Sequence, residues 1–175
     1  MNIKATIMAA AAALLLTGNI AKANDVLLYE QESYPQAYCL ALNMYYEARG
    51  STLADQIAVS DVVLNRVDDS RFPDTVCDVV YQAEMRPSWQ DETVMVPVRN
   101  RCQFSWFCDG KDDTPKDIEK FNNALHLAYF MLNADKYRGL TEGATHYHAH
   151  YVSPFWAKDF TRVGSVGAHI FYRWD

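Results

Sequence analysis

The sequence predicts one α+β domain, mainly helical, with a small antiparallel sheet late in the chain. Three observations support this. Apolar residues recur at three- and four-residue steps over 36–67 and 118–132, which is the helical period. Residue types alternate over 144–152, and short apolar runs follow over 163–174, as is typical of strands. The chain has 175 residues, half of them hydrophobic, so it can bury one core.

The first helix is expected over 36–49 and ends at Gly50. A second helix is expected to run to about 67 or 68, with Ser51 or Thr52 as its cap, and Thr52 with Asp55 three residues later resembles a capping box. A third helix is expected to open at Thr114-Pro115, with threonine as the cap and proline at the first helical position.

The remaining segments carry weaker patterns. Residues 24–33 are expected to form a loose arm, and the apolar piece 76–81 fits either a helix or a strand. Residues 83–101 are polar with two prolines, which predicts an extended loop.

The N-terminal segment 1–23 has the anatomy of a secretory signal peptide. Lys4 precedes an apolar run that is short for a membrane span, and Ala21-Lys22-Ala23 follows as a cleavage pattern. The alternative is an uncleaved anchor helix. We therefore expect an exported protein, periplasmic or extracellular, whose mature domain is 24–175.

Charge limits the partners of the mature chain. It keeps 14 basic and 22 acidic side chains, a net charge of -8. Binding to nucleic acid or to an anionic membrane by charge would need a basic surface. We expect no nucleic acid partner, no stable membrane anchor after cleavage, no cofactor, and a monomer.

Export makes the four cysteines candidates for disulfides. Three pairings are possible. The short loop favours Cys102–Cys108, which leaves Cys39–Cys77. The alternative is a metal site of four thiolates, which the lack of any C-x2-C pair disfavours.

Glu47 is the first catalytic candidate. It lies three residues after Met44, at the edge of the apolar stripe of its helix. A carboxyl group partly removed from water has a raised pKa and can act as a general acid. The alternative is a solvated glutamate that pairs with Arg49 or caps the helix.

Histidines alternate along the expected strand at His146, His148 and His150. On a strand all three would share one face, and His169 on a later strand could approach that face. Three imidazoles could hold zinc, but ligands on one straight strand converge poorly. A polar or substrate-lining face is favoured, and no metal site is expected.

An aromatic loop, residues 103–107, lies between Cys102 and Cys108. Tryptophan and phenylalanine faces stack on sugars or fill a core. A clamped loop that carries Gln103, Ser105 and Trp106 suits a preformed cleft, and the alternative is simple packing of the loop. The chain has no Gly-x-Ser-x-Gly, His-Glu-x-x-His or P-loop pattern, which disfavours serine hydrolases, zincins and nucleotide-binding proteins.

Residues 45–50, Tyr-Tyr-Glu-Ala-Arg-Gly, begin a series of motifs that resembles the SleB-type cell wall hydrolases, the spore cortex-lytic enzyme family. The further matches, in order, are 56–59, 63–67, 71–73, 76–82, 103–106, 143–148, 152–157 and 167–172. The resemblance covers nearly all of the mature chain. Ser51 and Ala168 depart from the family pattern, which commonly has an acidic residue and an asparagine there.

The resemblance implies a lysozyme-like fold and cleavage of peptidoglycan glycan strands. It places the catalytic glutamate on Glu47 and implies a lytic transglycosylase. Our hypothesis is cleavage of the β-1,4 bond between N-acetylmuramic acid and N-acetylglucosamine, with a 1,6-anhydro product. Glu47 serves as the acid and then as the base, so no second catalytic acid is needed. The expected cleft-lining residues are Gln103, Ser105, Trp106, Tyr147, His148 and His169.

Three alternatives remain open from the sequence. A muramidase-type hydrolase would use water, assisted by Asp55 or Asp61. A zinc-dependent wall peptidase would use His146, His148 and His150. A non-catalytic module would only bind the wall.

Overall fold

The computed structural model describes residues 31–175. The expected signal peptide, 1–23, and most of the expected arm, 24–33, lie outside the described residues. Within them, three long helices and a small three-stranded sheet confirm the predicted α+β class. No helix of this part of the chain combines the length and apolar character needed to cross a membrane.

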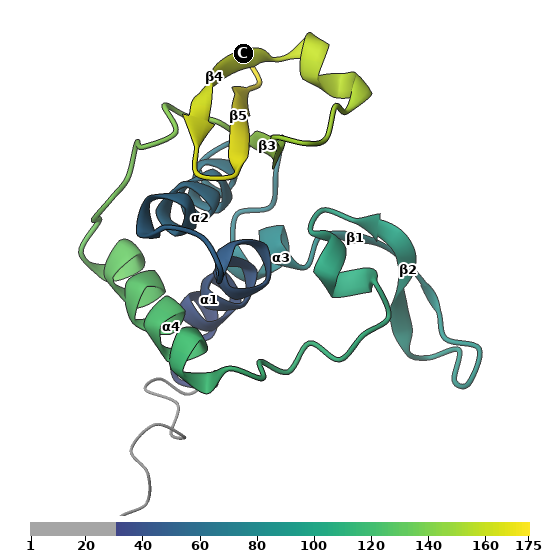
Figure 1. Cartoon of the computed structure of the whole chain (residues 1–175). Helices are drawn as coiled ribbons and strands as arrows, with labels where there is room; N and C mark the ends of the chain where they lie inside the picture. Colours follow the sequence, from purple (N-terminus) through teal and green to yellow (C-terminus); the bar gives the residue numbers. More distant parts are fainter. Residues whose placement is uncertain (1–30) are drawn as a thin grey trace, which may run out of the picture.

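Helix α1 (Pro35–Ala48) is the central element of the helical half, packed against α2 (Leu53–Val67), α3 (Val76–Val80) and α4 (Ile118–Asn133) (Figure 1). Every residue over 39–45 is buried, so this helix is surrounded on all sides rather than amphipathic as the spacing predicted. The surrounding helices place Asn43 in the core, together with apolar Leu40 and Met44.

The predicted cap of α2 is confirmed, because the Thr52 side chain accepts a hydrogen bond from the Asp55 N–H at 3.3 Å. The predicted cap of the last helix is wrong. Helix α4 begins at Ile118, and Asp117 caps it by accepting from the Lys120 N–H at 3.1 Å. The Thr114 hydroxyl donates instead to Asp112, so this threonine belongs to a separate turn.

Residues 83–101 form a hairpin, and the predicted loop is wrong. Strand β1 (Ala83–Pro87) pairs antiparallel with β2 (Met95–Cys102). In a two-stranded ribbon each strand has a free edge, so Pro87 and Pro97 are tolerated. The ribbon extends away from the helices (Figure 1). The short helix η2 (Ser105–Cys108) follows it, and the ambiguous piece 76–81 is helical.

The late sheet packs on α2 and has the strand order β3-β5-β4. Its antiparallel strands are β3 (His146–Ala149), β4 (Thr161–Val166) and β5 (His169–Arg173), and helix η3 (Phe155–Asp159) lies between β3 and β4. Phe171 of β5 is buried against Val59 and Val62 of α2. Figure 1 shows the sheet at the α2 side of the molecule.

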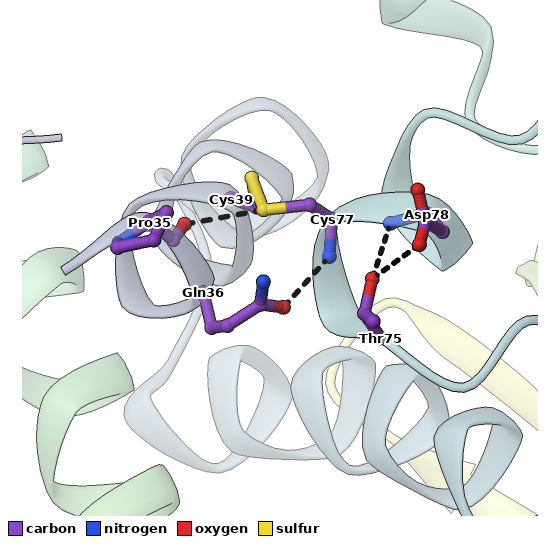
Figure 2. The surroundings of a disulfide bond; sticks show 6 residues. All are labelled: Pro35, Gln36, Cys39, Thr75, Cys77 and Asp78. Atoms are coloured by element: carbon purple, nitrogen blue, oxygen red, sulfur yellow. Dashed lines mark hydrogen bonds between the residues drawn. A yellow bond between two sulfur atoms is a disulfide. The ribbon is translucent and has the colours of Figure 1, made fainter. Parts of the chain in front are cut away.

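Two disulfides are present, with the pairing that the short-loop argument favoured. Cys39–Cys77 ties α1 to α3, and Cys102–Cys108 joins the end of β2 to η2. Figure 2 shows the first bridge, beside which the Gln36 side chain accepts a hydrogen bond from the Cys77 N–H at 3.1 Å. The second bridge therefore fixes the aromatic loop at both of its ends.

Candidate active site

A cavity of about 460 Å³ lies where the end of α1, the loop around η2 and strands β3 and β5 meet. Charged and hydrogen-bonding side chains, among them Glu47, Arg66 and Asp109, form part of its wall, which suits a hydrophilic ligand. The residues that line it are Tyr46, Glu47, Arg66, Cys102, Gln103, Phe104, Ser105, Trp106, Asp109, Tyr147, His148, Ala149, Tyr151 and His169.

Glu47 is half-buried in the last turn of α1, at the wall of this cavity. Burial raises the pKa of its carboxyl group above the ordinary 4.5. The Tyr147 hydroxyl, the His169 ring and the Arg66 guanidinium act in the opposite direction, but burial prevails. The acid form of Glu47 therefore persists to higher pH than that of a solvated glutamate.

Arg66 of α2 supplies a buried positive charge beside Glu47. Its side chain is 2% exposed, and its Nε donates to the Thr145 carbonyl at 2.7 Å. The Gln103 amide, oriented with its oxygen toward Arg66, accepts from both terminal guanidinium nitrogens at 3.0 Å. Burial lowers the pKa of Arg66 to about 10, so it stays charged at neutral pH.

Sequence reasoning missed the role of Arg66. A signal was available, because Arg66 follows Val62 and Val63 at helical spacing and so lies on the apolar face of α2. A charged residue on a buried face needs partners, and such residues are candidates for a site.

Trp106 of η2 forms an aromatic wall of the cavity. Its ring stacks on that of Tyr46, with centroids 4.8 Å apart, and its indole N–H donates to Asn43 Oδ1 at 3.2 Å. The ring is 7% exposed, so the predicted loop both packs into the core and lines the cavity. The disulfide and this hydrogen bond hold the wall in place without a ligand.

Tyr147 presents a buried hydroxyl group between Glu47 and Asn43. No well-formed hydrogen bond satisfies this hydroxyl within the described residues, although it lies close enough to lower the pKa of Glu47. Burial, with the nearby Glu47 charge, holds the pKa of Tyr147 well above 10. It is therefore a neutral neighbour of the carboxyl group.

His169 is held from behind by Asp55, which is fully buried on α2. Asp55 Oδ1 lies 2.7 Å from His169 Nδ1, and Oδ2 accepts from the Ala168 N–H at 3.2 Å. Burial acts to raise the pKa of Asp55, but hydrogen bonds from His169, Ser51 and Ala168 outweigh it and lower the pKa. Asp55 itself does not line the cavity.

Asp109 is the second carboxylate at the cavity. It accepts hydrogen bonds from the Lys111 ammonium and the Lys111 N–H at 2.9 and 2.8 Å, which lower its pKa. It therefore loses its proton at a lower pH than Glu47 does.

The structure brings Glu47 together with all six residues that the sequence predicted for the cleft. His148 lines the cavity, but both of its ring nitrogens have partners, the Ala149 carbonyl at 2.9 Å and the Tyr172 hydroxyl at 3.1 Å. The alternative pairing of Glu47 with Arg49 is absent from residues 31–175, where Arg49 lies over the Tyr45 ring.

His146 and His148 share one face of β3 as expected, and both rings contact Trp156, but His150 and His169 do not join them. His146 stacks on Phe160, and His150 lies beyond the end of β3, where its Nδ1 contacts the Ala168 carbonyl at 3.1 Å. His169 lies opposite Ala149 in the register, so it shares a face with Tyr147 and not with His146. Residues 31–175 contain no group of three or more His, Cys, Asp or Glu side chains arranged to hold a metal ion.

Asp61 also lies away from the cavity. It is fully buried and accepts hydrogen bonds from the Gly139 N–H, from both the N–H and the hydroxyl of Thr141, and from Arg138. Its place is structural, since it ties α2 to the chain that leads into β3.

Comparison with known proteins agrees with this geometry. The model of a family described as cell wall hydrolase matches residues 50–172. A spore cortex-lytic enzyme of Oceanobacillus iheyensis is 41% identical over 54 residues, which are 27% of this chain and 20% of that protein. The chain thus aligns with about a fifth of the length of that relative.

Two solved structures share the fold. The catalytic domain of the germination-specific lytic transglycosylase SleB from Bacillus anthracis matches with a TM-score of 0.57 and 23% identity, over 83% of this chain and 97% of that one. The catalytic domain of the Bacillus cereus SleB protein matches with a TM-score of 0.56 and 23% identity, over 87% and 98%. The resemblance read from the motifs is therefore confirmed.

Proposed function

Because the chain belongs to the cell wall hydrolase family, we propose that it degrades peptidoglycan by cutting the β-1,4 bond between N-acetylmuramic acid and N-acetylglucosamine, as a lytic transglycosylase. The observation that carries this proposal is Glu47, a half-buried carboxyl group with a raised pKa at the wall of a polar cavity. The matched SleB domain from Bacillus anthracis is described as a lytic transglycosylase, which supports the reaction type.

In the first step Glu47 acts as the acid. Its proton passes to the oxygen that leaves with N-acetylglucosamine, and positive charge develops at C1 of the muramic acid ring. Burial supplies the protonated carboxyl group that this step needs, and loss of the proton leaves an anion that favours the cationic ring.

In the second step the Glu47 carboxylate acts as the base. It takes the proton from the C6 hydroxyl of the muramic acid, whose oxygen closes on C1 to give the 1,6-anhydro ring. Glu47 is then protonated again, so one carboxyl group completes the cycle. The Arg66 charge stabilises the carboxylate between the two steps.

Substrate binding relies on local contacts. The Trp106–Tyr46 pair and the exposed Tyr151 ring offer aromatic surface for sugar rings, and Gln103 and Ser105 offer hydrogen bonds. We assign the six predicted cleft residues to substrate binding on this basis.

The second candidate function is hydrolysis, which is favoured by the position of Asp109 at the same cavity as Glu47. An ionised carboxylate at the same cavity could orient water for attack on C1. Substitution Asp109→Asn separates the two. A transglycosylase keeps its anhydro products and most of its rate, whereas a hydrolase that uses Asp109 loses activity.

The domain is proposed to work outside the cytoplasm, as a periplasmic or extracellular monomer. Two disulfides favour an oxidising compartment, and peptidoglycan lies there.

The test of the proposal is the isosteric change Glu47→Gln. The variant should bind purified peptidoglycan as the wild type does but should lose at least about a hundredfold in muropeptide release, because it has no proton to give. Wild-type release by a folded Glu47→Gln protein would overturn the assignment. Binding of peptidoglycan by the wild type without any release of muropeptides would instead indicate a module that only binds.

A further inference from the structure

Both carboxylate oxygens of Asp55 form hydrogen bonds with the turn that carries His169. Oδ1 meets His169 Nδ1 at 2.7 Å, and Oδ2 accepts from the Ala168 N–H at 3.2 Å. Asp55 and its partner ring are 0% and 7% exposed, so solvent does not compete for these bonds. An ionised carboxylate only accepts hydrogen bonds, so His169 must donate from Nδ1.

Gly167 shows how closely this turn lies on Asp55. A Cβ atom at position 167 would be 2.5 Å from Cβ and Cγ of Asp55, and the residue has φ +55. The close approach requires glycine, and it brings the Ala168 N–H and His169 onto the carboxylate.

Donation from Nδ1 is compatible with two forms of the ring, and in the protonated form, whose charge lowers the pKa of Glu47, Nε2 also carries a proton. In a neutral imidazole with its proton on Nδ1, Nε2 is an acceptor. Nε2 has no partner among residues 31–175, and the ring lines the cavity beside Glu47. In the neutral ring, the bond to Asp55 therefore leaves Nε2 as a hydrogen-bond acceptor at the cavity.

Asp109 and the Ser105 hydroxyl are further acceptors of the cavity, and Asp109 already accepts from Lys111, whereas the groups beside Glu47 are mainly donors. Arg66 has only N–H groups, Gln103 turns its oxygen to Arg66, and Glu47 begins the reaction as an acid. Sugar hydroxyls can accept from such donors. An acetamido N–H can only donate, so it needs an acceptor in the cavity.

We propose that Asp55 is a positioning residue that fixes the Nδ1–H form of His169, and that His169 Nε2 accepts a hydrogen bond from the acetamido N–H of the N-acetylated sugar at the cut bond. The second half of this assignment rests on the proposed function, because that function supplies the sugar.

The first measurement uses the wild-type protein and needs no variant. Nitrogen-15 NMR of the His169 ring, at a pH where the ring is neutral, should show the proton on Nδ1. Addition of a soluble N-acetylglucosamine–N-acetylmuramic acid oligosaccharide to Glu47→Gln should move the Nε2 resonance upfield, as a new hydrogen bond requires. A proton on Nε2, or an Nε2 signal unmoved at saturation, would overturn the proposal.

The second measurement compares three variants by kcat/KM on the same oligosaccharide. Asp55→Asn cannot accept from both His169 and Ala168, and His169→Asn can keep the bond to Asp55 but lacks Nε2. Each should lose at least about tenfold. Asp61→Asn is the matched control, since Asp61 is equally buried on the same helix but is remote from the cavity.

The outcomes separate this inference from the proposed function. Activity within twofold of the wild type in folded Asp55→Asn and His169→Asn would refute the role of the pair. An equal loss of kcat/KM in folded Asp61→Asn would also refute it, because a change at any buried carboxylate of α2 would then be enough to lower activity. Lysis by Glu47→Gln would instead refute the proposed function, whatever the His169 ring shows.

Discussion

Glu47 is a carboxyl group whose neighbours act on its pKa in opposite directions. Burial raises the pKa, and Tyr147, His169 and Arg66 each lower it. The site can therefore hold a proton for the first step and still tolerate the anion that follows it.

Removal of the Tyr147 hydroxyl tests this balance. In Tyr147→Phe the pKa of Glu47 should rise further, so the alkaline limb of the pH–activity profile should move to higher pH. The free energy of unfolding should change by less than about 1 kcal/mol, because the lost hydroxyl has no well-formed hydrogen bond.

The matched control is Tyr172→Phe. Its hydroxyl bonds to His148 at 3.1 Å, so this variant should lose about 1 kcal/mol of stability and leave the alkaline limb in place. An alkaline limb that moves to lower pH in Tyr147→Phe would contradict the assigned contact.

The raised pKa of Glu47 also predicts how stability changes with pH. The folded protein holds a proton that the unfolded chain has released above pH 4.5, so this group's contribution is lost as pH rises toward the folded pKa. Glu47→Gln should therefore unfold at a higher temperature than the wild type at neutral pH. The difference should vanish at acid pH. If the stability of Glu47→Gln relative to the wild type were instead lower at neutral pH than at acid pH, the pKa of Glu47 would not be raised in the folded protein.

At the scale of elements, the helices, strands and caps that depend on local residue patterns were predicted from the sequence. Helices α1 and α2 and the late strands follow from apolar spacing, and the Thr52 cap follows from its partner Asp55. The hairpin β1–β2 was missed because its strands are exposed and do not alternate, so pairing alone defines them. The Thr114 cap failed because two candidate caps lie three residues apart, and Asp112 takes the threonine hydroxyl.

The two disulfides should separate stability from activity. Replacement of Cys39 and Cys77 by alanine opens a link across 38 residues and should cost about 4 kcal/mol of stability. The same change at Cys102 and Cys108, a link across 6 residues, should cost about 2 kcal/mol. The second pair should lose more activity per folded molecule, since it releases the Trp106 wall. The reverse order of activity loss, measured at full folding, would contradict the role of the clamp.

At the scale of the whole molecule, the net negative charge of the protein repels its negatively charged substrate. The sequence carries a net charge of -6, which becomes -8 for the expected mature chain, and peptidoglycan is rich in carboxylates. The site meets this with Arg66 and aromatic surface inside the cavity rather than with a basic face.

Added salt should therefore not lower the activity of the enzyme on peptidoglycan. From low to physiological ionic strength, screening reduces the repulsion between the two anions, so kcat/KM on peptidoglycan should hold or rise. Initial rates across a sodium chloride series check this. A fall of tenfold or more would indicate that a basic surface of the protein binds the substrate.

The site residues that belong to sequence motifs could be predicted. Those whose position depends on contacts between distant parts of the chain could not. Glu47 and the six cleft residues lie in motifs of the resembling family. Arg66 lies in such a motif too, but its place at the cavity depends on Thr145 and Gln103, which are distant in sequence. The pairing of Asp55 with His169 depends on the register of β5 and on the glycine turn before it.

The most direct test of the central claim is mass spectrometry of the muropeptides that the wild-type protein releases in water enriched in oxygen-18. If Glu47 alone passes the proton and the C6 oxygen closes the ring, the new ends are 1,6-anhydro and carry no label. Reducing ends that carry oxygen-18 would show that water attacks C1, and the account of Glu47 as both acid and base of a transglycosylase would be contradicted.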